Sequence, residues 1–249
     1  MNDYTIMEIT PKQAKELVCE HHYSGKVVAN SRLHLGVFKP NEFFGEELVG
    51  VLQFGSPMNP NTTPQKICRN SNNMLELNRM VMLPSEPRNS ESKAISKAIK
   101  YIKTNYKDVD WLLSFSDGKE NNVGYIYQAS NWLYLGFMLS NSFYILNDQY
   151  YHAVSLWHKY KEHDNSKLKT NDLICKDPEL NYISMVICKQ HVYVMPLKKH
   201  ISFNFPPRQY PKMELEIAIL NRKVLKENGT VVLNPQWDKK LQKYEHQIH

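Results

Sequence analysis

Several features that define broad classes of protein are missing from this chain. Its 249 residues include only nine glycines and no internal repeat, which excludes collagen-like and low-complexity proteins. Its four cysteines show no CxxC spacing and no metal-finger pattern, so we expect reduced thiols and predict no metal. No apolar run is long enough to span a bilayer, and Asp3 and Glu8 stand where a signal sequence would be basic and apolar. We therefore predict a cytoplasmic globular protein without membrane association.

The formal net charge of +6 is unevenly distributed along the chain. Residues 1–154 hold 15 Lys/Arg and 15 Asp/Glu, whereas residues 155–249 hold 16 and 10. Within 189–226 there are 8 basic and 2 acidic residues, interleaved with the aromatic residues Tyr193, Phe203, Phe205 and Tyr210. Cations and rings in one segment suit a nucleic-acid surface, because cations contact phosphate and rings stack on bases. A solvated face on a mildly basic protein is the alternative.

The stretch from residue 76 to residue 134 organises the rest of the chain. Residues 76–83 are mostly apolar and end at Pro84, which predicts a buried strand. A helix follows, and Asn89 or Ser90 can cap free amides at its start. Its apolar stripe consists of Ala94, Ile95, Ala98, Ile99 and Ile102. Residues 111–116 and 132–137 predict two further strands, with a short helix over 123–129 between them.

The remaining elements are predicted on either side of that stretch. The N-terminal part reads as a strand, a helix with a capping box at Thr10, a hairpin and an exposed loop, over 4–9, 10–21, 33–54 and 59–73. The C-terminal part reads as one strand, a charged connector, a second hairpin and a helix, over 143–157, 159–171, 183–197 and beyond 212. We predict a catalytic domain over 1–158 and a basic C-terminal extension over 159–249.

The order of these elements predicts a mixed α/β (α+β) fold with a central mixed sheet flanked by helices. The order resembles that of the GNAT superfamily of acyl-CoA transferases. In that superfamily the fourth strand and the helix after it hold the pantetheine and pyrophosphate of the donor. The usual glycine-rich phosphate loop is absent here, because residues 87–92 contain no glycine.

Polar and aromatic residues recur in a fixed order at the ends of the predicted elements. The clusters are His22-Tyr23-Ser24, Leu77-Asn78-Arg79, Asn89 with Ser92, Ser114-Phe115-Ser116-Asp117, and Tyr127-Gln128-Ala129 with Asn131-Trp132. They resemble the phage Mom DNA-modification family, divergent GNAT-like transferases that modify adenine in DNA. The resemblance implies addition of a carbamoylmethyl- or methylcarbamoyl-type group to the N6 amine of adenine, which protects phage DNA from restriction in the host cytoplasm.

The same resemblance implies which residues bind and react. The positions that correspond to active-site or donor-binding residues are His22, Tyr23, Arg79, Ser92, Asp117 and Tyr127. We add Ser114 and Ser116 as catalytic candidates, and as further donor contacts Met80, Val81, Arg88, Asn89 and Ser90. The implied donor is acetyl-CoA or a related activated acyl group, with a charged tRNA as the alternative; iron and a homodimer stay open. Double-stranded DNA is the implied partner, held by Lys189, Lys198, Lys199, Arg208 and Lys212.

Each reactive candidate also has a structural interpretation. Asp117 can take a proton from an attacking amine or bind a base edge, or it can shape a turn. Arg79 interrupts an apolar strand and needs an anion, either Asp117 or a donor phosphate. Ser92 can bind pyrophosphate with the free amides of its helix, or cap them. His22 suits acid–base chemistry, and Tyr127 can protonate a departing thiolate; both can equally be core residues.

Two other functions remain open from the sequence. A GNAT-type enzyme acting on a protein, a small amine or an aminoacyl-tRNA would need the donor site but not the basic segment. A non-catalytic DNA-binding protein on the same fold would bind DNA in a salt-dependent way without binding a donor.

Overall fold

A computed structural model describes residues 4–22, 24–41, 43, 45–117, 122–180, 182–212 and 223–227. The chain divides into two compact units. Unit 1 comprises Met1–Ser116, Gly124–Gly136 and Val192–Tyr210, and unit 2 comprises Asp117–Val123, Phe137–His191 and Pro211–His249. The predicted boundary at residue 158 lies inside unit 2, because two long strands each contribute residues to both units. The assignment of catalysis to 1–158 and of DNA contact to 159–249 stays a prediction.

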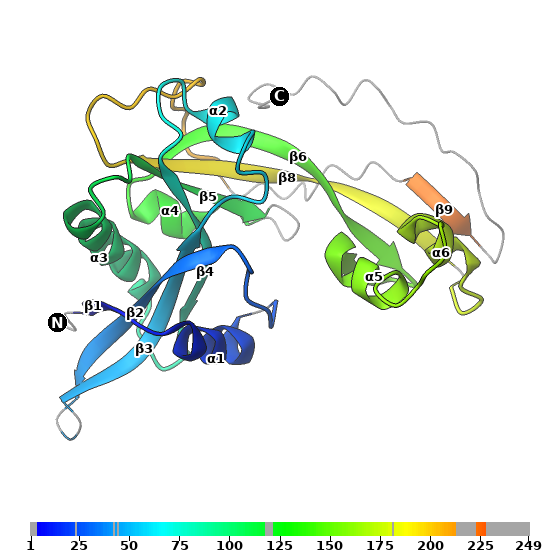
Figure 1. Cartoon of the computed structure of the whole chain (residues 1–249), viewed down its shortest axis with the longest axis horizontal. Helices are drawn as coiled ribbons and strands as arrows, with labels where there is room; N and C mark the ends of the chain where they lie inside the picture. The colour runs from blue at the N-terminus through cyan, green and yellow to red at the C-terminus, as the bar shows by residue number, and fades with distance from the viewer. Residues whose placement is uncertain are drawn as a thin grey trace. The chain divides into compact units, whose positions relative to one another are not determined.

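The predicted mixed α/β fold is confirmed. Among the described residues, nine strands form one sheet in the order β1-β2-β3-β4-β5-β8-β6-β7, with β9 paired to β8. The first three strands are antiparallel neighbours: β1 (Thr5–Glu8), β2 (Ser31–Asn41) and β3 (Gly45–Gly55). Strand β3 pairs antiparallel with β4 (Met74–Met82), and β4 pairs parallel with β5 (Trp111–Asp117). The crossover from β4 to β5 is α3 (Ser90–Asn105), drawn in Figure 1.

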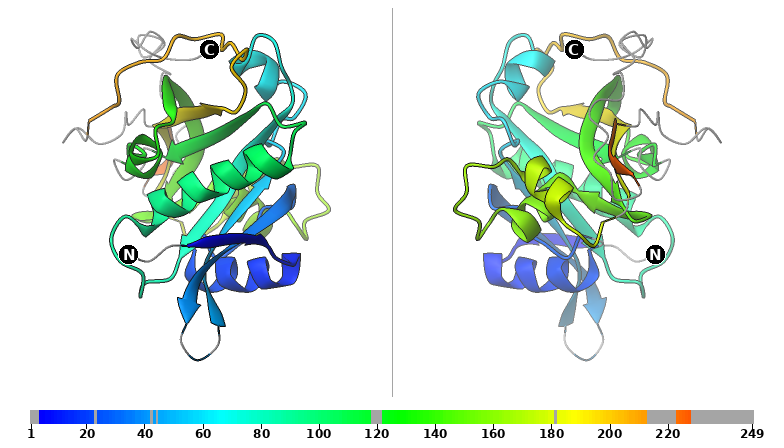
Figure 2. Two further views of the ribbon diagram at one scale, coloured as in Figure 1. Left: turned by 90° about the vertical axis from the view of Figure 1, so that its left-hand side faces the viewer. Right: turned by 90° about the vertical axis from the view of Figure 1, so that its right-hand side faces the viewer.

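Two helices of unit 1 cover opposite faces of these strands. Helix α1 (Pro11–His21) begins with the predicted capping box of Thr10 and Gln13 and packs on Val51 and Val81. Helix α3 packs its buried stripe on the other face, which includes Leu52, the neighbour of Val51 on β3. Successive strand residues point to opposite faces, so each helix covers one of them. Figure 2 shows α3 lying across the strands.

The rest of unit 1 is built after β5. Helix α4 (Tyr125–Ala129) is shorter than predicted, because Gly124 has a left-handed backbone with φ 77° and the helix starts only after it. The chain then enters β6 (Leu133–Leu146) and later returns along β8 (Tyr182–Pro196). The predicted second hairpin over 183–197 is wrong: β8 is continuous there, and His191, taken for part of a turn, is buried with its ring 6.4 Å from that of Phe137.

Unit 2 has its own apolar core. A strand lies within the predicted range 143–157, as β7 (Gln149–His152), and residues 161–169 of the predicted connector form no helix or strand. The two helices on either side of that connector, α5 (Ala153–Tyr160) and α6 (Thr170–Lys176), were not predicted. The core of buried residues consists of Tyr144, Leu146, Leu156, Ile174, Leu180 and Ile183. The helix predicted beyond residue 212 lies outside the described residues, except that residue 223 begins β9 (Lys223–Glu227). No helix in the described ranges is long and apolar enough to cross a bilayer.

Candidate functional site

Strand β4 carries a bulge at its centre. Gln53 of β3 pairs with Arg79, but its neighbour Phe54 pairs with Leu77, so Asn78 is an extra residue on β4. A bulge of this kind bends the strand and redirects the side chains that follow. Leu77 accordingly packs in the core under α3, whereas Val81 packs under α1. The Asn78 side chain is fixed, because its Oδ1 accepts a 3.1 Å hydrogen bond from Ser31 Oγ.

Strands β4 and β5 pair only at their beginnings. The register contains three pairs, from Met74 with Trp111 to Glu76 with Leu113, although both strands continue past them. Beyond the last pair the two are linked through a side chain, since Ser114 Oγ donates to Leu77 O at 3.3 Å. After Glu76, the backbone N–H and C=O groups of β4 that face β5 therefore form no backbone hydrogen bonds with that strand.

Arg79 joins β4 to the segment after α1. Its Nε donates to Lys26 O at 3.0 Å and its Nη1 donates to Asn78 O at 2.7 Å. These two backbone carbonyls orient the half-buried guanidinium. The contact with Lys26 also fixes the turn that contains His22 and Ser24.

His22 lies at the C-cap of α1 and is neutral near pH 7. Burial, and secondarily the charge of Arg79, lower the pKa of its imidazole to about 4. Its Nδ1 accepts the Ser24 amide N–H at 3.1 Å, so the proton of the neutral ring is on Nε2. In this state His22 offers a hydrogen-bond donor, not a free basic nitrogen. Tyr23, the next predicted catalytic residue, lies outside the described residues.

Glu76 is a further candidate, which was not predicted from the sequence. Burial raises the pKa of its carboxyl to about 7, against smaller opposing effects of a hydrogen bond from Asn78 and the charge of Arg79. A carboxyl that titrates near neutral pH suits a proton acceptor. The available signal was a second charged residue, three positions before Arg79, in the same apolar strand.

Ser114 and Tyr127 were predicted separately and are in direct contact. The Ser114 and Tyr127 hydroxyls are hydrogen-bonded to each other at 2.8 Å, and both side chains are buried. The Tyr127 ring packs on the rings of Trp132 and Tyr193, with centroids 5.4 and 5.2 Å apart. Gln128 Nε2 donates to Tyr193 OH at 3.1 Å, so Gln128 also belongs to this cluster.

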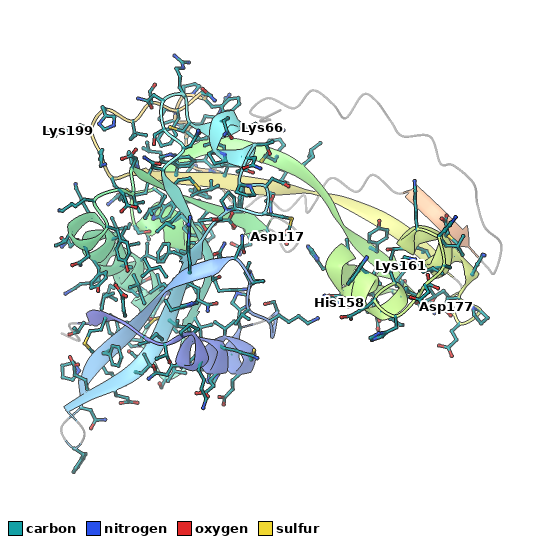
Figure 3. The ribbon with its side chains drawn as sticks, viewed as in Figure 1. Lys66, Asp117, His158, Lys161, Asp177 and Lys199 are labelled. Carbon is teal, nitrogen blue, oxygen red and sulfur yellow. The ribbon has the colours of Figure 1, made fainter. Side chains whose placement is uncertain are left out.

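Gly124 allows this cluster to close against β5. A Cβ at Gly124 would lie 2.6 Å from Tyr193 Cε2, 3.0 Å from Tyr127 Cδ2 and 3.1 Å from Ser116 Cβ. Only glycine fits both this space and the left-handed backbone. Ser116 is buried beside it, and Asp117 is the last residue of β5, labelled in Figure 3.

The predicted donor contacts lie on β4 and at the start of α3. Asn89 occupies the N-cap with φ 68°, but its side chain makes no capping hydrogen bond, so that part of the prediction is wrong. The hydroxyl of Ser90 donates to Glu91 Oε2, and that of Ser92 donates to Asn89 O. No N-cap side chain therefore takes the first free amides of this 16-residue helix. Arg88 is exposed, Met80 is partly buried and Val81 is buried in the core.

The predicted DNA contacts have different environments. Lys198 Nζ pairs with Asp110 Oδ1 at 2.5 Å, and Arg208 Nε donates to Leu135 O at 3.3 Å. Lys189 Nζ lies 5.0 Å from the ring centroid of Phe137. Lys199 and Lys212 are exposed. Among the residues that the structure describes, no group of three or more His, Cys, Asp or Glu is arranged to hold a metal ion.

The sequence has recognisable relatives. A profile of the Mom protein family matches residues 3–212. The methylcarbamoylase Mom of Escherichia phage Mu is 42% identical over 144 residues, which are 57% of this chain and 57% of the phage Mu protein. The chain thus matches little more than half the length of that curated relative.

Similar solved structures include acetyltransferases. Arabidopsis thaliana NAA60 in complex with a bisubstrate analogue has a TM-score of 0.47 and 9% identity, covering 78% of this chain and 98% of the other. A Bacillus subtilis acetyltransferase in complex with CoA has a TM-score of 0.41 and 10% identity, covering 80% of this chain and all of the other. TM-scores below 0.5 are too low for residue roles to be transferred.

Proposed function

This chain belongs to the Mom protein family, and from that premise we propose that it is a transferase that modifies adenine in double-stranded DNA. It adds an acyl-derived group of the methylcarbamoyl type to the N6 amine. The relative from phage Mu, named a methylcarbamoylase, supports this type of group. In a phage such a modification would hide restriction sites from host nucleases.

The observation that carries the proposal is the interrupted pairing of β4 and β5 beside the bulge at Asn78. After Glu76 the backbone of β4 does not pair with that of β5. The carbonyls of Leu77 and Asn78 accept bonds from Ser114 and Arg79, and the backbone groups after them can bind the polar chain of an extended donor by strand addition. The amides at the start of α3, the helix that follows β4, can take the donor's phosphates. Acetyl-CoA or a related activated acyl compound has both a polar chain and phosphates. The phosphates are bound by the predicted contacts Arg88, Asn89, Ser90 and Ser92.

The acceptor side of the site is supplied by Glu76, Arg79 and His22. The exocyclic amine of adenine is a weak nucleophile, so its proton must leave as the new N–C bond forms. Glu76 takes that proton, because its pKa of about 7 leaves a large ionised fraction at neutral pH. The new N–C bond forms at the carbonyl carbon of the donor's thioester as its C–S bond breaks, and Tyr127 is the predicted acid that protonates the departing thiolate. The group transferred is the acyl group that the donor carries, so acetyl-CoA itself would deliver acetyl, and a methylcarbamoyl group requires a related thioester that already contains the methylcarbamoyl nitrogen. Asp117, the proton acceptor predicted from the sequence together with His22, stays the alternative to Glu76 in this role.

Duplex DNA must be distorted for this reaction. The N6 amine of a stacked, paired adenine cannot enter a protein site, so the base is flipped out of the helix. The basic segment that follows β8 holds the backbone of the DNA.

The test is transfer of an isotope label from donor to DNA by the purified protein. Duplexes containing adenine, and matched duplexes with 7-deazaadenine or without adenine, are incubated with labelled acetyl-CoA or with charged tRNA. We expect label in every DNA that retains the N6 amine and none in the duplex without adenine. Label in added protein or polyamine but not in DNA would replace this proposal with a conventional N-acyltransferase. Salt-dependent DNA binding with no donor binding would replace it with a non-catalytic DNA-binding protein.

A further inference from the structure

Two distant segments of unit 1 form one surface. Residues 56–73, which contain α2 (Thr63–Ile67), lie beside residues 197–210, which follow β8 (Figures 1 and 2). Arg69 N donates to Ser202 O at 2.8 Å and Asn204 N donates to Ile67 O at 2.9 Å. Between these bonds, Cys68 and Phe203 form an antiparallel bridge. The two segments are therefore joined as a short two-stranded ribbon.

Asparagine side chains strengthen the junction. Asn70 Nδ2 donates to His200 O at 2.8 Å, and Asn70 Oδ1 accepts from Ser202 N at 3.0 Å. Asn204 Nδ2 donates to the carbonyls of Gln65 and Lys66, at 2.8 and 3.0 Å. Because amide side chains and backbone make these contacts, the side chains of Lys66, Arg69 and Lys199 are not needed to hold the two segments together.

The surface is cationic and has almost no compensating charge. Residues 56–73 contain Lys66 and Arg69 and no acidic residue; residues 197–210 contain Lys198, Lys199 and Arg208 and no acidic residue. Lys198 is neutralised by Asp110. Lys66, Arg69 and Lys199 are exposed, and within the described ranges none of them takes part in an ion pair. Figure 3 labels Lys66 and Lys199, one on each segment.

The same segment connects this surface with the candidate site. After Phe203 the chain runs to Arg208, whose amide N–H donates to Tyr134 O at 2.8 Å. Tyr210 then donates its hydroxyl to Trp132 O at 2.9 Å, and the Trp132 ring packs on Tyr127. A polyanion bound along the segment would thus be held next to the cluster that contains Ser114 and Tyr127.

We propose that the surface defined by Lys66, Arg69 and Lys199, here called the α2 ridge, binds the phosphate backbone of duplex DNA and presents it to the site. The proposal rests on the proposed function for the choice of DNA. Exposed cations without carboxylate neighbours release counterions when they meet phosphate, which gives sequence-independent, salt-dependent binding. Since the ridge is fixed by backbone and amide contacts, it sets the orientation of the duplex and leaves base selection to the site.

The test compares two variants of the full chain with equal net charge. The ridge variant is Lys66→Gln/Arg69→Gln/Lys199→Gln. The control is Lys15→Gln/Lys100→Gln/Lys103→Gln, which removes three exposed cations from α1 and α3. Affinity for a fluorescent duplex is measured by anisotropy over a series of salt concentrations, and urea unfolding checks that both variants fold.

We expect the slope of log K against log salt to become shallower by about 2.7 in the ridge variant, about 0.9 for each phosphate that the variant no longer neutralises. A slope difference of this size means that a fourfold rise in salt weakens the wild type about 40-fold more than the ridge variant. The control should change the slope by less than about 0.9. Equal changes of slope in the two variants would show that only the overall charge matters and would overturn the proposal. Tighter binding of an A-form RNA duplex than of a DNA duplex would also overturn it.

Labelled-donor transfer separates this proposal from the proposed function. A wild type that modifies adenine while the ridge variant keeps the full salt slope would overturn the ridge alone. A wild type that transfers nothing while the ridge variant loses the slope would support the ridge and remove the proposed enzymatic activity.

Discussion

Replacing Glu76 by glutamine tests the electrostatics of the site through stability. Burial of the carboxyl raises its pKa from 4.5 to about 7. The folded protein therefore holds this proton more tightly than the unfolded chain does. The group's favourable contribution is fully present below about pH 4.5 and is lost as the pH rises through about 7.

The size of the effect follows from the shift. One pKa unit corresponds to about 1.4 kcal/mol, so a rise from 4.5 to about 7 makes the ionised wild type less stable by about 3 kcal/mol. Glutamine keeps the shape and a polar partner for Asn78 but does not ionise. We therefore expect the stability of Glu76→Gln, relative to wild type, to increase by about 3 kcal/mol between pH 4.5 and about pH 8.

Urea unfolding at a series of pH values between these limits measures the difference. Glu16→Gln, on the exposed side of α1, is the matched control and should differ from the wild type by an amount that barely changes with pH. Background titrations, such as those of the half-buried His22 and the buried His191, cancel in the comparison with wild type. A difference between Glu76→Gln and wild type that is the same at all pH values would refute the reasoning.

Four further substitutions test the packing and hydrogen bonds of the site. Gly124→Ala should lower the free energy of unfolding by well over 1 kcal/mol, because the new Cβ adds a close contact to the backbone strain. Gly45→Ala is the control: its φ is 78° and no atom lies within 4 Å of the new Cβ, so it introduces the strain alone and should lower the free energy of unfolding by less. Ser114→Ala and Tyr127→Phe should each cost about 1–3 kcal/mol, and a double variant whose loss equals the sum would show that their 2.8 Å bond has no coupling energy. Arg79→Gln should speed hydrogen exchange of residues 24–27, whose carbonyl contact at residue 26 it weakens, and unchanged exchange there would contradict the tethering role.

Local patterns were enough to predict the elements that carry the site. The capping box at Thr10 and the apolar stripe of α3 depend on spacings of three and four residues, and both are observed. The pairing of Ser114 with Tyr127 was not visible, although both residues were predicted, because it depends on how α4 packs against β5. The bulge at Asn78 depends on how β4 pairs with β3, and the sequence of β4 alone does not determine that register.

Long-range contacts account for the remaining differences. Residues 59–73 look like an exposed polar loop in sequence, but Asn70 and Asn204 tie the loop to a segment more than 130 residues away. A hairpin was predicted over 183–197, whereas β8 runs through these residues as one strand hydrogen-bonded to β6. The raised pKa of Glu76 likewise follows from burial by neighbouring strands and not from the residues beside it in sequence.

The central claim concerns the fate of adenine in DNA. Cells that express the chain are grown, and their DNA is digested to nucleosides whose masses are measured beside those from cells with the empty vector. We expect a deoxyadenosine heavier by one methylcarbamoyl-type group, with the other three nucleosides unchanged. Deoxyadenosine of normal mass in the presence of folded, donor-binding protein would contradict it.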